Sequence, residues 1–209
     1  MKILTIYPGS VNDRHIAEAV GVLRDGGIII YPTDTLYAFG CDALNNRAIE
    51  RLCHLKGLNP AKNLLSVVCS DISQAAEYAR IDNHAFRILK QYLPGPFTFI
   101  LPSSTTLPKV FKGRKSVGIR VPDNEIALAL ARELGNPLMT SSIPLDDFAD
   151  TGYVEAVDPR SVALKYENEG EIELAIDGGE GSTEPSTVVD ILDSTSPEII
   201  RPGLGEFEE

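Results

Sequence analysis

The chain has 209 residues, 43% of them hydrophobic, and a formal net charge of −11. This length and composition predict one large domain over residues 1–209 with a sizeable core. No apolar run approaches the roughly 20 residues of a membrane span, and the first residues resemble a strand rather than a signal peptide, so we expect a cytoplasmic protein. The three cysteines lack a CxxC spacing, which argues against a disulfide framework or a zinc site.

Predicted helices alternate with strands in the first half of the chain. Apolar residues recur at helical spacing over residues 12–25, with Ser10 or Asn12 as the N-cap, and the apolar run 27–31 predicts a buried strand. The same reasoning predicts further helices over residues 46–55, 71–80 and 83–93, and strands over residues 64–69 and 97–101.

The second half of the chain is richer in strands. We expect a strand over residues 117–121, then a helix that Asp123 caps and Gly135 ends, and then strands over residues 138–142, 174–177, 187–191 and 198–201. Helices between the early strands and turns between the late ones predict a mixed α/β sheet rather than an all-parallel one. The short acidic tail from about residue 203 is expected to be frayed.

Polar side chains are concentrated in Tyr31-Pro-Thr-Asp-Thr-Leu-Tyr37, directly after the predicted core strand. Two hydroxyls, a carboxylate and a phenol at a strand end are typical of a ligand site in an α/β protein. The same residues also suit a turn in which the threonine and aspartate side chains bond their own backbone. The residues alone favour neither interpretation.

Three later segments also place polar groups beside apolar strands. Arg120 lies inside an apolar strand, where a guanidinium either reaches solvent or meets an anion. Residues 140–142 carry three hydroxyl side chains. A glycine-rich loop over residues 178–186 favours a flexible turn, and Ser186 and Thr187 lie at its junction with the next strand. Because strand ends can converge on one cleft, these segments together predict a binding site.

A basic island interrupts the acidic chain. Residues 109–122 contain five lysines and arginines and no acid. Such an island indicates either an anionic ligand or a solvated loop, and both alternatives remain open.

These motifs resemble those of the YrdC-like superfamily, which includes the threonylcarbamoyl-AMP synthases. The resemblance runs from about Asn12 to Gly203 and rests on several ordered motifs. The matching segments are Tyr31–Tyr37, Leu55-Lys-Gly57, Pro94-Gly-Pro-Phe-Thr-Phe-Ile-Leu101, Gly118–Pro122, Pro137–Ser141, Pro185–Asp190 and Ile199–Gly203.

The resemblance implies a twisted, open α/β sheet flanked by helices with a large concave cavity, of the YrdC/RibB-like type. Synthase members condense L-threonine, bicarbonate and ATP, with Mg²⁺ on the nucleotide, into threonylcarbamoyl-AMP and pyrophosphate. The product supplies the N6-threonylcarbamoyl group of adenosine 37 in tRNA. The resemblance implies no tightly bound cofactor and no protein metal site.

Site residues carry over by position as implications of the resemblance. The implied threonine-binding residues are Thr35, Arg120, Ser141 and Ser186. The implied ATP-binding residues are Lys56, Lys62, Ser116 and Arg201, and Lys56 and Ser141 are the implied catalytic residues.

Two positions depart from the synthase pattern. Synthases have Lys-x-Arg where this chain has Lys56-Gly57-Leu58, and Ser-x-Asn where it has Ser141-Ser142-Ile143. Both departures resemble the YciO branch, and because these are cavity positions in the family we expect weakened or altered activity. One alternative is a double-stranded RNA-binding or translation-associated module, which the basic island favours and the net charge of −11 opposes. A second alternative is a nucleotide sensor that keeps the cavity without the chemistry.

Overall fold

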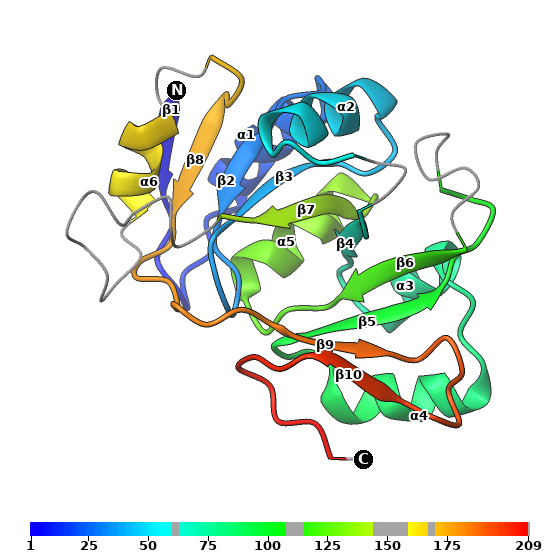
Figure 1. Cartoon of the computed structure of the whole chain (residues 1–209). Helices are drawn as coiled ribbons and strands as arrows, with labels where there is room; N and C mark the ends of the chain where they lie inside the picture. The colour runs from blue at the N-terminus through cyan, green and yellow to red at the C-terminus, as the bar shows by residue number, and fades with distance from the viewer. Residues whose placement is uncertain (60–62, 108–114, 144–158, 167–169, 209) are drawn as a thin grey trace.

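A computed structural model describes residues 1–59, 63–107, 115–143, 159–166 and 170–208. Its centre is a ten-stranded sheet in the order β1-β8-β2-β3-β7-β4-β6-β5-β9-β10 (Figure 1). The strands are β1 Lys2–Thr5, β2 Ile29–Tyr31, β3 Ala38–Asp42, β4 Ser66–Val68, β5 Phe97–Pro102, β6 Ser116–Arg120, β7 Leu138–Ser142, β8 Leu174–Asp177, β9 Thr187–Asp190 and β10 Glu198–Arg201.

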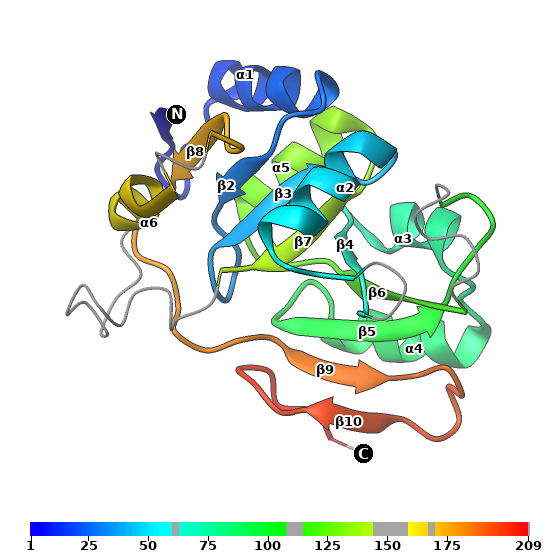
Figure 2. The same cartoon turned by 45° about the horizontal axis from the view of Figure 1, so that its top comes forward.

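The sheet is mixed, as the sequence predicts. The pairs β1/β8, β2/β8, β4/β6 and β5/β9 are parallel, and the pairs β2/β3, β3/β7, β4/β7, β5/β6 and β9/β10 are antiparallel. The strands nearest the two termini, β1 and β10, form opposite edges of the sheet (Figure 2).

Helices cover both faces of the sheet, and the alternation of side chains along β2 shows why. Ile28 and Ile30 lie in one apolar cluster, while Ile29 and Tyr31 lie in the other, because successive strand residues point to opposite faces. Residues of α1 and α5 complete the second cluster, and residues of the other helices complete the first. The helices are α1 Asp13–Arg24, α2 Asn46–Leu55, α3 Ile72–Tyr78, α4 Asn83–Tyr92, α5 Glu125–Leu134 and α6 Pro159–Tyr166.

The N-cap of α5 is Asn124, not the predicted Asp123. The Asn124 Oδ1 accepts hydrogen bonds from the backbone N–H groups of Ile126 (3.1 Å) and Ala127 (3.0 Å). Asp123 instead donates its own backbone N–H to a carboxylate oxygen of Asp34, at 2.9 Å. The start of α5 is therefore tied to the 31–37 segment.

Two elements were not predicted. Strand β3 reads Ala-Phe-Gly-Cys-Asp, and glycine inside a strand weakens the sequence signal. Gly40 is required there because a Cβ would lie 2.7 Å from Cε1 of Tyr31 on β2. Helix α6 lies in an acid-rich stretch and has only eight residues, too few to show a clear helical period in the sequence.

The C-terminal residues are packed rather than frayed. The Phe207 ring lies 4.8 Å from the Tyr92 ring, centroid to centroid, and Gly205 O accepts a hydrogen bond from Thr187 Oγ1 at 2.6 Å. Aromatic packing and backbone bonding thus replace the fraying expected from an acidic composition. Among the described helices, none has the length and apolar character needed to cross a membrane.

Candidate functional site

A cavity of about 320 Å³ lies where the central strands β4, β6 and β7 approach β5, β9 and β10. Its polar lining consists of two arginines, Arg120 and Arg201, and of hydroxyl side chains. Its apolar lining includes Leu58 and Met139. The hydroxyl-bearing residues are Ser66, Thr98, Thr140, Ser141, Ser142 and Ser186.

Sheet register brings several of these side chains to one place. Ser66 on β4 lies opposite Thr140 on β7 and opposite Gly118 on β6. A Cβ at Gly118 would overlap Ser66 Oγ and crowd the methyl group of Thr98, so the glycine leaves space for two of the lining side chains. Three strands that are distant in sequence therefore present hydroxyls to the same cavity.

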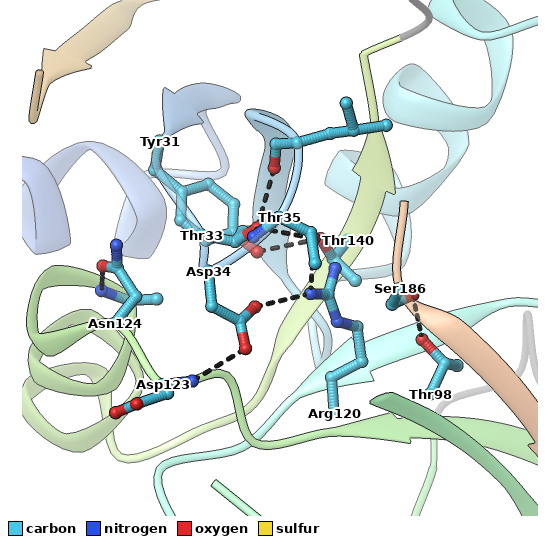
Figure 3. A network of polar contacts seen from close by, with 12 residues as sticks. Tyr31, Thr33, Asp34, Thr35, Thr98, Arg120, Asp123, Asn124, Thr140 and Ser186 are labelled. Carbon is cyan, nitrogen blue, oxygen red and sulfur yellow. Dashed lines mark hydrogen bonds and ion pairs between the residues drawn. The ribbon is translucent and has the colours of Figure 1, made fainter. Parts of the chain in front are cut away.

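Arg120 is the most deeply buried charge in the lining, with 3% of its side chain exposed. Its Nη2 donates to Asp34 Oδ1 and to Thr35 Oγ1, both at 2.9 Å (Figure 3). Its Nε is buried without a partner among the described residues. The guanidinium is thus anchored through Nη2 to the 31–37 segment, while the residue itself lines the cavity.

The threonines of the 31–37 segment form a chain of hydrogen bonds behind Arg120. Thr33 Oγ1 donates to Leu36 O at 2.7 Å and accepts from the backbone N–H of Thr35 at 3.0 Å. Because that donation uses the Thr33 proton, Thr35 Oγ1 donates to Thr33 Oγ1 across 3.1 Å while it accepts from Arg120. The segment is therefore both a side-chain-stabilised turn and the support of a site residue.

The Asp34 carboxylate balances the charge of Arg120 at a position largely shielded from solvent. Only 8% of the Asp34 side chain is exposed, and its second oxygen accepts the Asp123 N–H. Burial raises the pKa of the Asp34 carboxyl above its usual range, although Arg120 and the Asp123 N–H oppose that shift.

Arg201 also lines the cavity and belongs to the edge strand β10. Its Nη2 donates to Ser186 O at 2.7 Å, and Ser186 Oγ in turn lies 2.9 Å from Thr98 Oγ1 (Figure 3). Partial burial, followed by the positive charge of Arg120, lowers the pKa of Arg201. Two positively charged guanidinium groups in the lining of one cavity favour an anionic ligand there.

Tyr31 fixes a further lining hydroxyl. Its phenol bonds Thr140 Oγ1 at 2.8 Å, and burial raises the pKa of Tyr31 to about 12. The phenol therefore stays neutral. The other phenol of the segment, Tyr37, bonds the backbone of Gly178 and Gly179, which ties the glycine-rich loop to the segment.

The structure brings together four of the expected site residues: Arg120, Ser141, Ser186 and Arg201 all line the cavity. Thr35 lies behind Arg120 and is 1% exposed. Of the remaining three, two lie outside the lining and one falls outside the described residues.

Lys56 is the C-cap of α2 and lies outside the residues that line the cavity, with its Nζ 5.6 Å from the centroid of the Phe39 ring. Ser116 begins β6 opposite Pro102, also outside the lining. Lys62 lies outside the described residues, as does most of the basic island, residues 108–114.

The two departures from the synthase pattern occupy different environments. Leu58 lines the cavity. Ile143 is 1% exposed within the apolar core, and its N–H donates to Tyr37 O at 2.9 Å. Only Leu58 therefore contacts the cavity in this structure.

Sequence reasoning missed Ser66 and Thr98 as lining residues. Thr98 gave a signal, because it is the one polar side chain in the apolar run 97–101. Ser66 gave none, because its exposure to the cavity depends on Gly118 of a neighbouring strand. Asp34 and Tyr31 lie in the recognised segment, but their partners Arg120 and Thr140 are distant in sequence.

The fold and the cavity define a mixed α/β protein with a site suited to a small anionic molecule. The family model for Sua5/YciO/YrdC proteins, described as Telomere recombination, matches residues 21–203. The chain belongs to this family.

Relatives in the family include both YciO proteins and synthases. The chain is 37% identical to YciO of Escherichia coli (strain K12) over 97% of this chain and 96% of the relative. The crystal structure of E. coli YciO superimposes with a TM-score of 0.85 at 35% identity, covering 99% of this chain and 98% of that one.

Similarity to the synthases is lower and covers only part of them. The chain is 35% identical to threonylcarbamoyl-AMP synthase of Bacillus subtilis (strain 168), over 93% of this chain and 55% of that protein. The structure of P. abyssi Sua5 complexed with L-threonine gives a TM-score of 0.82 at 30% identity, covering 97% of this chain and 58% of that one.

Proposed function

We propose that the cavity binds L-threonine and ATP and forms threonylcarbamoyl-AMP from them and bicarbonate, with the release of pyrophosphate. The observation that carries this proposal is the meeting of Arg120 and Arg201 in one cavity with six hydroxyl side chains. Similarity to the B. subtilis synthase and to the threonine-bound Sua5 supports the choice of substrates. The product would serve the modification of adenosine in tRNA.

The anchored guanidinium of Arg120 suits an amino-acid carboxylate. Its Nη2 is committed to Asp34 and Thr35 and its Nε is buried, so a carboxylate in the cavity would meet the group through Nη1. Ser141 and Thr140 offer hydroxyls that accept from an ammonium group or donate to an oxygen. Such contacts would orient the threonine amino group toward bicarbonate.

Adenylyl transfer requires positioning more than a protein nucleophile. The threonine amine and bicarbonate form a carbamate with loss of water; a carbamate oxygen then attacks the α-phosphorus of ATP, and the bond to the departing pyrophosphate breaks. Arg201 would neutralise charge on the phosphates, which is stabilisation by proximity and electrostatics.

In this proposal Mg²⁺ binds to the protein as a complex with ATP. The described residues contain no group of three histidine, cysteine, aspartate or glutamate side chains that could hold a metal ion. In the proposal Mg²⁺ is bound by the ATP phosphates and water, where it would screen phosphate charge.

Leu58 makes the proposed activity weaker than that of a synthase with arginine at this position. It gives the cavity an apolar contact where a cation would bind phosphate. We therefore expect slow turnover rather than the loss of binding.

The direct test is pyrophosphate release from ATP at high protein concentration, with L-threonine and bicarbonate present or omitted singly. The proposal predicts release that requires all three substrates and that falls to the blank in the Arg120→Met variant. Pyrophosphate release that does not depend on threonine, or no release above the blank, would refute synthase activity.

RNA binding has no support from the described residues. The basic island that favoured it lies largely in residues 108–114, outside the part of the chain that the structure describes. It stays a prediction of the sequence alone.

A further inference from the structure

The segment after Arg201 braces the edge wall of the cavity. We define residues 202–208 as the C-terminal strap. Leu204 N–H donates to Pro185 O at 2.9 Å, and Gly205 O accepts from Thr187 Oγ1 at 2.6 Å. The strap is thus bonded to the residues on both sides of Ser186.

The strap crosses the backbone at Ser186 too closely for any side chain. A Cβ on Gly203 would overlap Pro185 O and the carbonyl group of Ser186. The same Ser186 carbonyl accepts the hydrogen bond from Arg201 Nη2, at 2.7 Å. Strap, Ser186 and Arg201 therefore form one compact unit at the cavity edge.

Phe207 anchors the far end of the strap. Its ring centroid lies 4.8 Å from that of Tyr92, 6.5 Å from Phe97 and 6.3 Å from Phe99. Glu208 N–H also donates to the Tyr92 hydroxyl, at 3.2 Å. Because Phe97 begins the strand that carries Thr98, the anchor is continuous with the cavity wall.

Strand β10 has little else to hold it. It ends the sheet and pairs, among the described strands, with β9 alone. All four of its residues are exposed, including Ile199 (37%) and Ile200 (53%), and its pairing is irregular between Ile199 and Arg201. A strand with one partner and so little burial belongs to the least stable parts of a fold.

We propose that Phe207 is a positioning residue, which acts through the strap to hold Arg201 and Ser186 in the geometry that the cavity requires. Phe207 does not line the cavity, so its effect on a ligand passes through Arg201. This role rests on the proposed function only where ligand binding is measured.

Hydrogen exchange tests the positioning directly, without reference to any ligand. In Phe207→Ala we expect the backbone amides of residues 198–201 to exchange about tenfold faster or more, with amides of β2 and α1 unchanged. Phe207→Leu, which keeps an apolar side chain, should recover most of the protection. Phe86→Ala is the matched control, because Phe86 is 47% exposed on α4 and lies outside the cavity lining. If the amides of residues 198–201 exchange at the wild-type rate in Phe207→Ala, the proposal is overturned.

A double-mutant cycle tests whether the effect of Phe207 on ligand affinity passes through Arg201. The probe is sodium pyrophosphate, titrated into wild type, Phe207→Ala, Arg201→Ala and the double variant by calorimetry. We expect each single variant to lose about tenfold in affinity and the double variant to lose no more than Arg201→Ala alone. Additive losses would overturn the proposal. If the wild type does not bind pyrophosphate, the nucleotide part of the proposed function fails, and hydrogen exchange alone decides the role of Phe207.

Discussion

Arg120 and Asp34 form a pair that almost no solvent reaches, with 3% and 8% of their side chains exposed. Removing one partner of such a pair leaves a buried charge with nothing to balance it. The pair therefore couples the stability of the fold to the geometry of the site.

Arg120→Met should lower the free energy of unfolding by about 3–5 kcal/mol, because Asp34 remains buried and unpaired. The matched control is Arg160→Met, which breaks an ion pair to Asp177 in which the arginine side chain is 66% exposed. That change should cost less than about 1 kcal/mol. Urea unfolding of both variants measures the difference; equal losses would show that the Arg120 pair is not buried in solution.

The Asp34 carboxyl should titrate above its usual range, because burial outweighs the attraction of Arg120. The folded state then holds this proton more tightly than the unfolded chain does. Its contribution to stability is complete below the ordinary carboxyl pKa and is lost as the pH rises through the folded pKa. Carbon-13 NMR of the carboxyl carbon reports the pKa. Asp34→Asn should remove this loss of stability with rising pH. If the free energy of unfolding of the variant depends on pH as in the wild type, the dependence does not arise from Asp34.

Leu58 and Ile143 should respond differently to restoration of the synthase residues. Leu58→Arg adds a third cation to the cavity lining and should raise pyrophosphate release about tenfold, through charge-assisted bonds to phosphate. Ile143→Asn places an amide in the apolar core and should instead lower the free energy of unfolding by about 3 kcal/mol. Turnover assays and urea unfolding on the two single variants separate these effects. A gain of activity from Ile143→Asn without loss of stability would show that residue 143 reaches the ligand.

At the scale of elements, the sequence predicted most helices and strands because their apolar period was intact. Helix α2 begins and ends at the predicted residues, 46 and 55. Strand β3 was missed because Gly40 interrupts it, and that glycine is explained only by Tyr31 on the neighbouring strand. The identity of a glycine in one element can thus depend on a side chain in another.

Gly40→Ala should destabilise the protein by about 1–3 kcal/mol, since the new methyl group would displace the Tyr31 ring and its hydrogen bond to Thr140. Gly21→Ala is the control: Gly21 lies in α1 with nothing within 4 Å of an added Cβ. That change should stabilise by about 0.5–1 kcal/mol. Thermal unfolding compares the two variants, and a stable Gly40→Ala would mean that the contact between β2 and β3 is looser than the structure has it.

At the scale of the whole molecule, the sheet order decides what the sequence could reveal. The motifs were readable one by one, but Ser66 and Thr98 became lining residues only when β4, β6 and β5 were placed side by side. Arg201 lies on the far edge strand and was assigned from the resemblance alone, yet the fold brings it to the cavity with Arg120. The acidic tail likewise gave no sign that Phe207 would pack against Tyr92.

We propose that the ligands bind in the cavity that Arg120 and Arg201 line. A crystal structure of the protein grown with L-threonine and a non-hydrolysable ATP analogue would locate them. We expect the threonine carboxylate within hydrogen-bonding distance of the Arg120 guanidinium and the nucleotide phosphates near Arg201. Ordered ligands bound elsewhere on the molecule, with the cavity filled only by water, would contradict the proposal.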